Sequence, residues 1–250
     1  MSIAFDIAGL RVRRGTTEAV RSASFQFVGP GWFGIIGANG SGKTSLLRAV
    51  AGRLDLSGGS ITIDDIDRTV DRAWRAQHIG FAPEGSVLPD ALTARDLYAV
   101  LSRGTGGVIS AALSQLHEAL GIAALLDRRI GSMSAGIRQR VALYSAFVAA
   151  HGRRIVILDE PFNWLDPVAS YDAKAALSAL VGEGLTLVTA LHDLSSLALS
   201  CDAGMMMAEG KVVAELSKTD LMQAGNDLPG FERSMMNRLR SSPSSATRGS

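Results

Sequence analysis

The sequence predicts an α/β fold: a mixed sheet with an antiparallel β-subdomain plus a mostly helical subdomain. Two apolar runs, Arg154 to Leu158 and Leu185 to Ala190, have the length of buried strands and flank a helix near Ser170 to Val181. This alternation is typical of a parallel sheet. From Ile3 to Val28, apolar residues alternate with polar or small ones, which favours antiparallel strands. From about residue 86 to residue 150, Ala and Leu recur at helical spacing, which predicts the helical subdomain.

A glycine-rich motif lies between a buried strand and a helix. The strand is the apolar run Trp32 to Ile36, and the helix is the stretch Lys43 to Leu54. Between them, GANGSGKT fits the phosphate-binding pattern of two glycines separated by four residues and followed by Lys and Thr. Its backbone N–H groups and the helix N-terminus attract phosphate oxygens. We therefore expect nucleotide phosphates to be bound by Gly37, Ala38, Asn39, Gly40, Ser41, Gly42, Lys43 and Thr44, with the Thr44 hydroxyl on Mg²⁺. GTPases, nucleotide kinases and motor proteins share this loop, so other motifs must identify the enzyme.

Two adjacent carboxylates follow the apolar strand that ends at Leu158. We expect Asp159 to hold Mg²⁺ and Glu160 to polarise the attacking water as the general base. An acidic pair at a strand end is also a common surface feature. The phosphate loop upstream favours the catalytic interpretation.

A turn of small and polar residues, Met133 to Arg140, leads into a helix that is predicted to start near Ile137. This segment resembles the signature sequence of ATP-binding-cassette (ABC) proteins, with Ser134 and Gly136 at the matching Ser and second Gly. With the two motifs above, it identifies the chain as similar to a P-loop NTPase of ABC type. Ser134, Gly136 and the helix N-terminus form a second anion site. In the family this site is used in trans, so the resemblance implies a second ABC ATPase chain, identical or paralogous, that completes each nucleotide site.

The resemblance implies two more site residues. Trp164 to Pro167 resembles the family's loop across the dimer interface, with Asp166 at the matching acidic position. His192 follows the apolar strand that ends at Ala190 and matches the family's switch histidine. It would contact the γ-phosphate and hold the attacking water beside Glu160.

At two positions the sequence departs from the family pattern. Glu84 follows Pro83 where the family usually has a Gln that touches Mg²⁺, and this pair resembles cassettes of the ABC-2 exporter type. A carboxylate can bind Mg²⁺ directly or through water, so we keep Glu84 as a metal-site residue. Arg14 stands where the family places an aromatic residue against adenine, and a guanidinium can stack on a base.

We therefore expect an ATP-binding and ATP-hydrolysing subunit that powers a membrane transporter, most like an ABC-2 exporter, with the transmembrane permease on separate chains. A non-transport cassette, for example of the iron–sulfur assembly type, remains the alternative. A regulatory cassette that does not hydrolyse ATP conflicts with the presence of Glu160 and His192. Ser134 follows Lys43 by only 91 positions, too few for a repair cassette with a long coiled coil.

Composition and length bound the remaining expectations. Lys plus Arg number 25 and Asp plus Glu 24, so the net charge of +1 gives no electrostatic case for nucleic acid. We expect one domain over residues 1–240 and a disordered tail over 241–250. The N-terminus has no export-signal pattern, and no apolar run approaches the ~20 residues that span a bilayer. The expected location is therefore cytoplasmic, at the inner face of the cell membrane through a permease.

Overall fold

The computed structural model describes residues 3–102, 110–149 and 155–241. Within these residues ten strands form one mixed sheet in the order β5-β4-β1-β2-β10-β9-β3-β8-β7-β6. The strands are β1 (Ile3–Arg14), β2 (Thr17–Gly29), β3 (Gly31–Ile36), β4 (Gly58–Ile63), β5 (Ile66–Asp67), β6 (Ile79–Phe81), β7 (Ile155–Asp159), β8 (Thr186–Leu191), β9 (Ala203–Ala208) and β10 (Lys211–Leu216). The mixed sheet confirms the predicted fold class.

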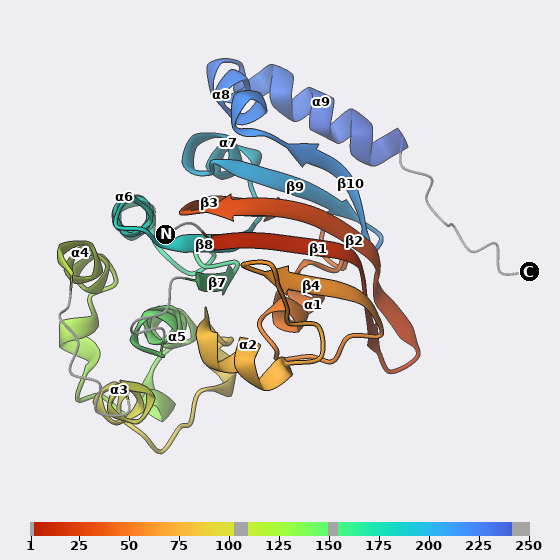
Figure 1. The fold of residues 1–250 in the computed structure, drawn as a ribbon. Coiled ribbons are helices and arrows are strands. Elements are labelled where there is room, and N and C mark those ends of the chain that lie inside the picture. The colour runs from red at the N-terminus through yellow and green to blue at the C-terminus, as the bar shows by residue number, and fades with distance from the viewer. Residues whose placement is uncertain (1–2, 103–109, 150–154, 242–250) are drawn as a thin grey trace, which may run out of the picture.

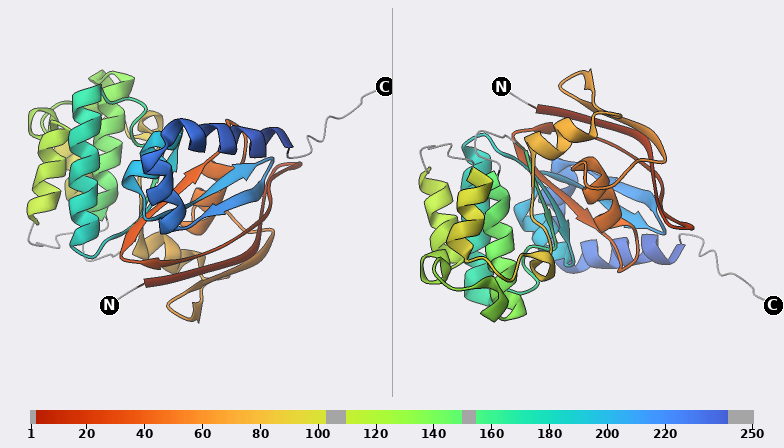
Figure 2. Two further views of the ribbon diagram at one scale, coloured as in Figure 1. Left: turned by 90° about the horizontal axis from the view of Figure 1, so that it is seen from above. Right: turned by 90° about the horizontal axis from the view of Figure 1, so that it is seen from below.

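Helices cover both faces of the sheet and form a separate group at one end. They are α1 (Lys43–Val50), α2 (Arg72–His78), α3 (Ala94–Ser102), α4 (Ala111–Ala119), α5 (Ala135–Ala149), α6 (Pro167–Gly182), α7 (Leu194–Ser200), α8 (Lys218–Asn226) and α9 (Leu228–Ser241). Short 3-10 turns lie at η1 (Gly85–Val87), η2 (Ile122–Leu125) and η3 (Ile130–Ser132). Figure 1 shows α7, α8 and α9 beside β9 and β10, and Figure 2 shows α3 to α6 gathered beyond the sheet.

The N-terminal strands form the predicted antiparallel subdomain. β1 pairs with β2 and with β4, and the β1–β2 turn contains Gly15 at a φ of +60°. Along β1 the buried Phe5 and Ile7 alternate with the exposed Asp6, as expected for a strand with one face on the core. The buried face packs against Leu46 and Leu47, so α1 lies in the hollow between this subdomain and the parallel strands.

Parallel pairing sets the positions of three strand ends. β3 and β7 flank β8, and all six residues of β8 are buried, which is typical of a central parallel strand. Ile36 at the end of β3 pairs with Leu191, while Asp159 at the end of β7 pairs with Ala190. The residues that follow β3, β7 and β8 are therefore placed at the same edge of the sheet.

Most of the predicted elements lie where the sequence analysis placed them. The turn-forming residues Glu209 and Gly210 predict a hairpin over Met205 to Glu215, and this segment forms β9 and β10 with the turn at those residues. One helix start was wrong: α5 begins at Ala135, not near Ile137, because Ala and Gly continue the helical backbone into the turn. The glycines of Gly104 to Gly107 predict a break in the helical pattern, but this segment lies outside the described residues. So do Arg154, the first residue of a predicted strand, and residues 242–250 of the predicted tail. Within the described ranges, none of the helices combines the length and hydropathy needed to cross a bilayer.

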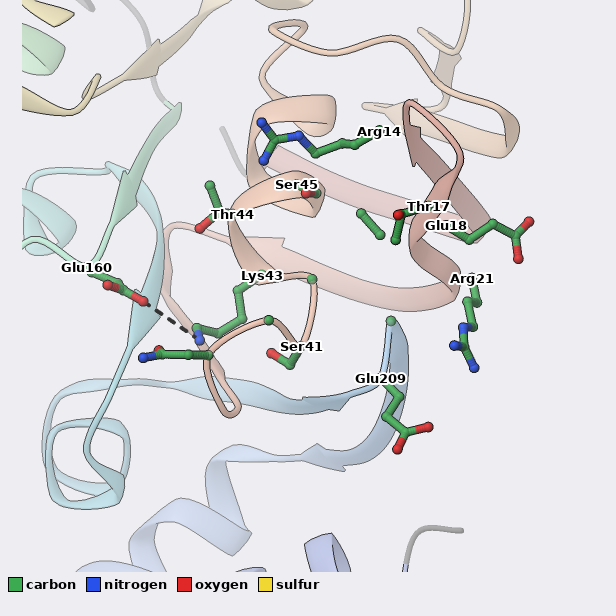
Figure 3. A pocket seen from close by; sticks show the side chains of 15 residues that line it. Arg14, Thr17, Glu18, Arg21, Ser41, Lys43, Thr44, Ser45, Glu160 and Glu209 are labelled. Carbon is green, nitrogen blue, oxygen red and sulfur yellow. Dashed lines mark ion pairs between the residues drawn. The ribbon is translucent and has the colours of Figure 1, made fainter. Parts of the chain in front are cut away.

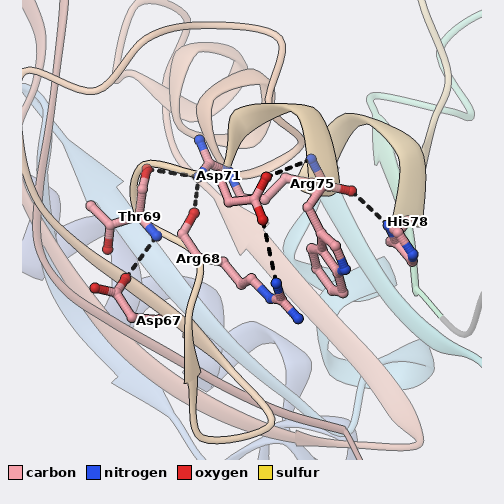
Figure 4. A network of polar contacts seen from close by, with 7 residues as sticks. Asp67, Arg68, Thr69, Asp71, Arg75 and His78 are labelled. Carbon is pink, nitrogen blue, oxygen red and sulfur yellow. Dashed lines mark hydrogen bonds and ion pairs between the residues drawn. The ribbon is translucent and has the colours of Figure 1, made fainter.

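A buried arginine fixes the connection between β5 and α2. Arg75 is 1% exposed, and its guanidinium donates to the carbonyl oxygens of Arg68 and, at 2.8 Å, Thr69. The Asp71 side chain caps α2 by accepting from the Trp74 N–H at 3.0 Å. Figure 4 shows these groups around a single turn. Because α2 leads directly into β6, this network also sets the entry to the Pro83–Glu84 segment.

Replacing Arg75 by Met tests this network, because Met keeps much of the side-chain length and removes all donors. The Arg68 and Thr69 carbonyls would lose their partner in a buried setting, so we expect the free energy of unfolding to fall by about 2 kcal/mol. Urea denaturation measures this change. Arg95→Met is the matched control, because it removes an exposed guanidinium paired with Asp127, and its effect should be much smaller. Equal losses in the two variants would contradict the structural role of Arg75.

Candidate functional site

The glycine-rich loop after β3 fits closely against two neighbouring strands. A Cβ atom on Gly37 would collide with the carbonyl oxygen of Met207 in β9. Gly42 has a φ of +104°, and a Cβ there would collide with the carbonyl oxygen of Ala19 in β2. Glycine is therefore required at both positions, for space at Gly37 and for space and backbone conformation at Gly42. The loop is a cradle built between β2, β9 and the start of α1.

Lys43 projects from the first residue of α1 into this cradle (Figure 3). It is 4% exposed, and its Nζ donates to the carbonyl oxygen of Gly37 at 2.7 Å and to that of Ala38 at 3.4 Å. The same Nζ lies 3.7 Å from Oε1 of Glu160. The buried ammonium and the N-terminus of α1 lie side by side, and both favour an anion.

A pocket of about 890 Å³ surrounds the cradle. It is lined by the loop from Asn39 to Ser45, by Glu160, and by the turns that connect β1 to β2 and β9 to β10. Arg14 lies on its wall, as the proposed contact to adenine requires, and Figure 3 shows the Arg14 side chain above Thr44 and Ser45. None of the described lining residues is aromatic. The contact between Arg14 and adenine stays a prediction.

Asp159 at the end of β7 has the features of a cation ligand. Its Oδ1 is buried and has no hydrogen-bond partner among the described residues. Burial raises the pKa of this carboxyl group, a hydrogen bond with Thr44 lowers it, and the neighbouring Glu160 raises it further. A buried carboxylate oxygen without a partner beside a Thr hydroxyl fits a hard cation such as Mg²⁺, which takes oxygen ligands. The predicted Mg²⁺ residues Thr44 and Asp159 are thus neighbours.

Glu160 is the point at which several of the predicted site residues meet. Its backbone has a φ of +51°, and its N–H donates to the carbonyl oxygen of Ala190 at 3.2 Å. Its Oε2 lies 2.7 Å from Nε2 of His192, which follows β8. The Asn163 amide donates to the same oxygen at 2.9 Å. A non-glycine residue at positive φ is uncommon and clusters at functional sites.

Glu84 lies on the wall of a second pocket, of about 330 Å³, together with Thr44, Asp159 and Glu160. Its carboxylate forms an ion pair with Arg48 of α1. Within the described residues, no three His, Cys, Asp or Glu side chains are grouped closely enough to hold a metal ion. A Mg²⁺ ion here would therefore need phosphate and water oxygens in addition to Thr44 and Asp159. The metal role of Glu84 stays a prediction.

Ser134 and Gly136 line neither pocket at the phosphate loop, although Ala135 between them lines the second pocket together with Thr44. Ser134 precedes α5 and its Oγ is 3.5 Å from the Ile137 N–H, while a Cβ on Gly136 would lie 3.4 Å from the carbonyl oxygen of Trp164. Asp166 caps α6 by accepting from the Ala169 N–H at 2.9 Å, a bond that lowers the pKa of Asp166. It also pairs with Arg140 at 3.0 Å. None of Ser134, Gly136 and Asp166 lines the pocket at the phosphate loop.

Two residues at the site were not predicted from the sequence. Arg48 lies five positions after Lys43 and reaches Glu84 in a different element. Asn163 lies three positions after Glu160 in the turn before α6. The three-residue spacing in a turn was a signal for Asn163, since side chains of Asn often bond to groups a few residues away. For Arg48 the sequence offered no signal of its partner.

Comparisons with known proteins agree with this geometry. The family described as ABC transporter matches residues 20–163, more than half of the chain. The chain is similar to the ABC transporter ATP-binding protein NatA of Bacillus subtilis, with 31% identity over 80% of this chain and 82% of NatA. It is 28% identical to the Nod factor export ATP-binding protein I of Bradyrhizobium diazoefficiens, over 86% of this chain and 70% of that protein. It is 29% identical to the hemin import ATP-binding protein HmuV of Pseudomonas entomophila, over 82% of this chain and 84% of HmuV.

Solved structures share the fold at lower identity. The structure of an ATP-binding subunit of an ABC transporter has a TM-score of 0.76 at 20% identity, over 93% of this chain and 99% of that one. The dimeric structure of MJ0796, a bacterial ABC transporter cassette, has a TM-score of 0.71 at 22% identity, over 86% of this chain and 98% of the MJ0796 chain.

Replacing Asp159 by Asn tests the environment of the buried carboxylate. Because the pKa of Asp159 is raised, the folded state disfavours the ionised form of this side chain. The resulting loss of stability is complete at pH values above the pKa in the folded state and vanishes at pH values below the pKa in the unfolded state. In EDTA at pH 7, we therefore expect Asp159→Asn to raise the free energy of unfolding by about 1 kcal/mol. Urea denaturation measures this change in the free energy of unfolding. Asp220, whose pKa is lowered by its bonds with Ser217, is the control of opposite sign: Asp220→Asn should lose stability. An Asp159→Asn variant less stable than the parent would contradict this account.

Proposed function

Because this chain belongs to the ABC transporter family, whose ATPases couple ATP hydrolysis to transport, we propose that Lys43, Glu160 and His192 form its hydrolytic centre. The supporting observation is the convergence of Lys43 Nζ and His192 Nε2 on the carboxylate of Glu160. These groups come from three neighbouring strand ends, so their spacing is set by the sheet. We propose that residues 37–44 hold the phosphates of ATP and that Arg14 contacts its adenine.

Each polar group has a chemical task in this proposal. Lys43 stabilises negative charge on the β- and γ-phosphates, as a cation in a buried cradle does well. Glu160 accepts a proton from the water that attacks the γ-phosphorus, and His192 orients that water and contacts the γ-phosphate. Mg²⁺ held by Thr44 and Asp159, with Glu84 near, would neutralise phosphate charge. Hydrolysis of the bond between the β- and γ-phosphates then gives ADP and phosphate.

We further propose that two chains act together. Ser134 and Gly136 provide backbone and hydroxyl donors at the start of α5, yet they lie outside the pocket of their own phosphate loop. A second chain in head-to-tail contact would bring these donors to the γ-phosphate, and Asp166 would lie at the interface. Exposed apolar side chains near Asp166 support this: Trp164 is 58% and Tyr171 76% exposed. MJ0796, a cassette with the same fold, is dimeric.

We propose that the direction of transport is export, and that the transporter is ABC-2-like, with its permease on a separate chain. The Pro83–Glu84 pair and the likeness to a Nod factor export protein support this direction. Likeness to hemin import proteins at similar identity makes import the alternative. In this proposal residues 1–240 form one cassette domain, with the helical subdomain at about 86–150. It works at the cytoplasmic face of the membrane, and nucleic acid has no part.

The assembly is tested by isolating the tagged chain from detergent-solubilised membranes of its native cells. We expect a membrane protein with several spanning helices to copurify, and its reconstitution with the chain into vesicles to show ATP-dependent movement of substrate. Recovery without any membrane protein would contradict the transporter assembly. Movement only toward the side of the vesicle on which the chain is bound would support import instead of export.

Replacing Glu160 by Gln tests the general base, because Gln keeps the shape of the side chain but does not accept the proton. We expect kcat for ATP to fall at least about 100-fold, while the Kd for ATP stays within a few-fold. Steady-state phosphate release and nucleotide binding measure the two quantities. Glu215→Gln in β10, an exposed position, is the matched control and should retain the parent kcat. Unchanged turnover in Glu160→Gln would show that another group is the base.

A further inference from the structure

The Asn163 side chain lies beside the carboxylate to which the general-base role is assigned. Its Nδ2 donates to Oε2 of Glu160 at 2.9 Å, and His192 Nε2 lies 2.7 Å from the same oxygen. Oε1 faces Lys43 at 3.7 Å. We propose that Asn163 is a positioning residue, which holds Oε2 and thereby directs Oε1 toward the attacking water. This inference rests on the proposed function of Glu160.

The carboxylate needs such support because its other two polar neighbours, Lys43 and His192, also contact the phosphates in the proposed function. The Glu160 side chain is 28% exposed, and a Glu side chain loses much rotamer freedom when it is fixed. Lys43 also donates to the phosphate loop, and His192 is the group proposed to contact the γ-phosphate. Both therefore have partners that compete with Glu160. Asn163 contributes a donor that is independent of the phosphate.

An amide is suited to this task. It donates a hydrogen bond to an ionised carboxylate but is itself neutral, so it neither takes up the transferred proton nor adds charge next to Asp159. A lysine at the same place would add a positive charge, and a histidine could take up the transferred proton. The Asn163 amide can therefore fix the direction of the base and leave its proton chemistry to Glu160 and the water.

The position of Asn163 is set by the fold. Its N–H donates to the carbonyl oxygen of Glu160 at 3.4 Å, and the Leu165 N–H donates to that of Phe162 at 3.1 Å, so two turns overlap. The Phe162 ring packs against Trp32, with ring centroids 6.4 Å apart, which anchors the turn to the core. Asp166 then begins α6. The donor is therefore held at a fixed distance from the strand end that carries Glu160.

Three substitutions in the full-length chain separate the loss of the donor from other effects. Asn163→Ala removes the donor, and we expect kcat for ATP to fall about tenfold with KM and nucleotide Kd within about twofold. Asn163→Asp keeps the shape but places a second carboxylate against Glu160, so kcat should fall further. Asn163→Gln keeps the amide at an exposed position with room for one more methylene, and should recover most of kcat.

Controls make the outcomes distinct. Asn237→Ala, at an exposed position in α9, should keep the parent kcat, and all variants should have the parent Tm. A parent-like kcat in Asn163→Ala, or a loss in Asn163→Gln as large as in Asn163→Ala, overturns the inference. If Glu160→Gln loses turnover in the same assay while Asn163→Ala does not, only the positioning role fails. If Glu160→Gln keeps its turnover, the base assignment and this inference fail together.

Discussion

The side-by-side pairing of β3, β8 and β7 is the constraint on which the site depends. Hydrogen bonds between these strands fix Ile36 opposite Leu191 and Asp159 opposite Ala190. Every residue of β8 is buried, so a shift in register would misplace tightly packed side chains and break the hydrogen bond from Trp32 Nε1 to Thr189 Oγ1 at 2.8 Å. The phosphate loop, the carboxylates and His192 follow directly from these strand ends. Their mutual distances are thus a property of the sheet.

The sheet edge formed by these strand ends also carries charged groups that are buried, Lys43 and Asp159 among them. Buried charges need oppositely charged or hydrogen-bonding partners. Lys43 is buried, and it is stabilised by carbonyl oxygens of its own loop and by nearby Glu160. Asp159 is less well compensated, and burial raises its pKa. In the proposed function, this incompletely paired carboxylate and the buried ammonium bind a cation and a polyphosphate together. The burial that suits Asp159 to a cation in the proposed function also disfavours its ionised form in the folded chain without a cation.

Features that are contiguous in the chain were predictable from the sequence, and features that join distant elements were less so. The phosphate loop was predictable because eight consecutive residues carry its chemistry, and the apolar runs identified the parallel strands. The ion pair between Arg48 and Glu84 was not, because long side chains on different elements can meet in many ways. The hydrogen bond from Asn163 to Glu160 had only the three-residue spacing in a turn as a signal, because the sequence does not reveal a positive φ at a non-glycine residue such as Glu160.

We propose that each nucleotide site is composed of two chains, and mixing two variants tests this composition. Lys43→Ala disables the phosphate loop of one chain, and Ser134→Arg blocks the signature of the other, so each variant alone forms only defective sites. If the sites are shared, mixed dimers contain one site with an intact loop and an intact signature, and mixing restores ATP turnover well above the sum of the two variants. Turnover equal to that sum at every mixing ratio, with mixed dimers demonstrated, would contradict the claim.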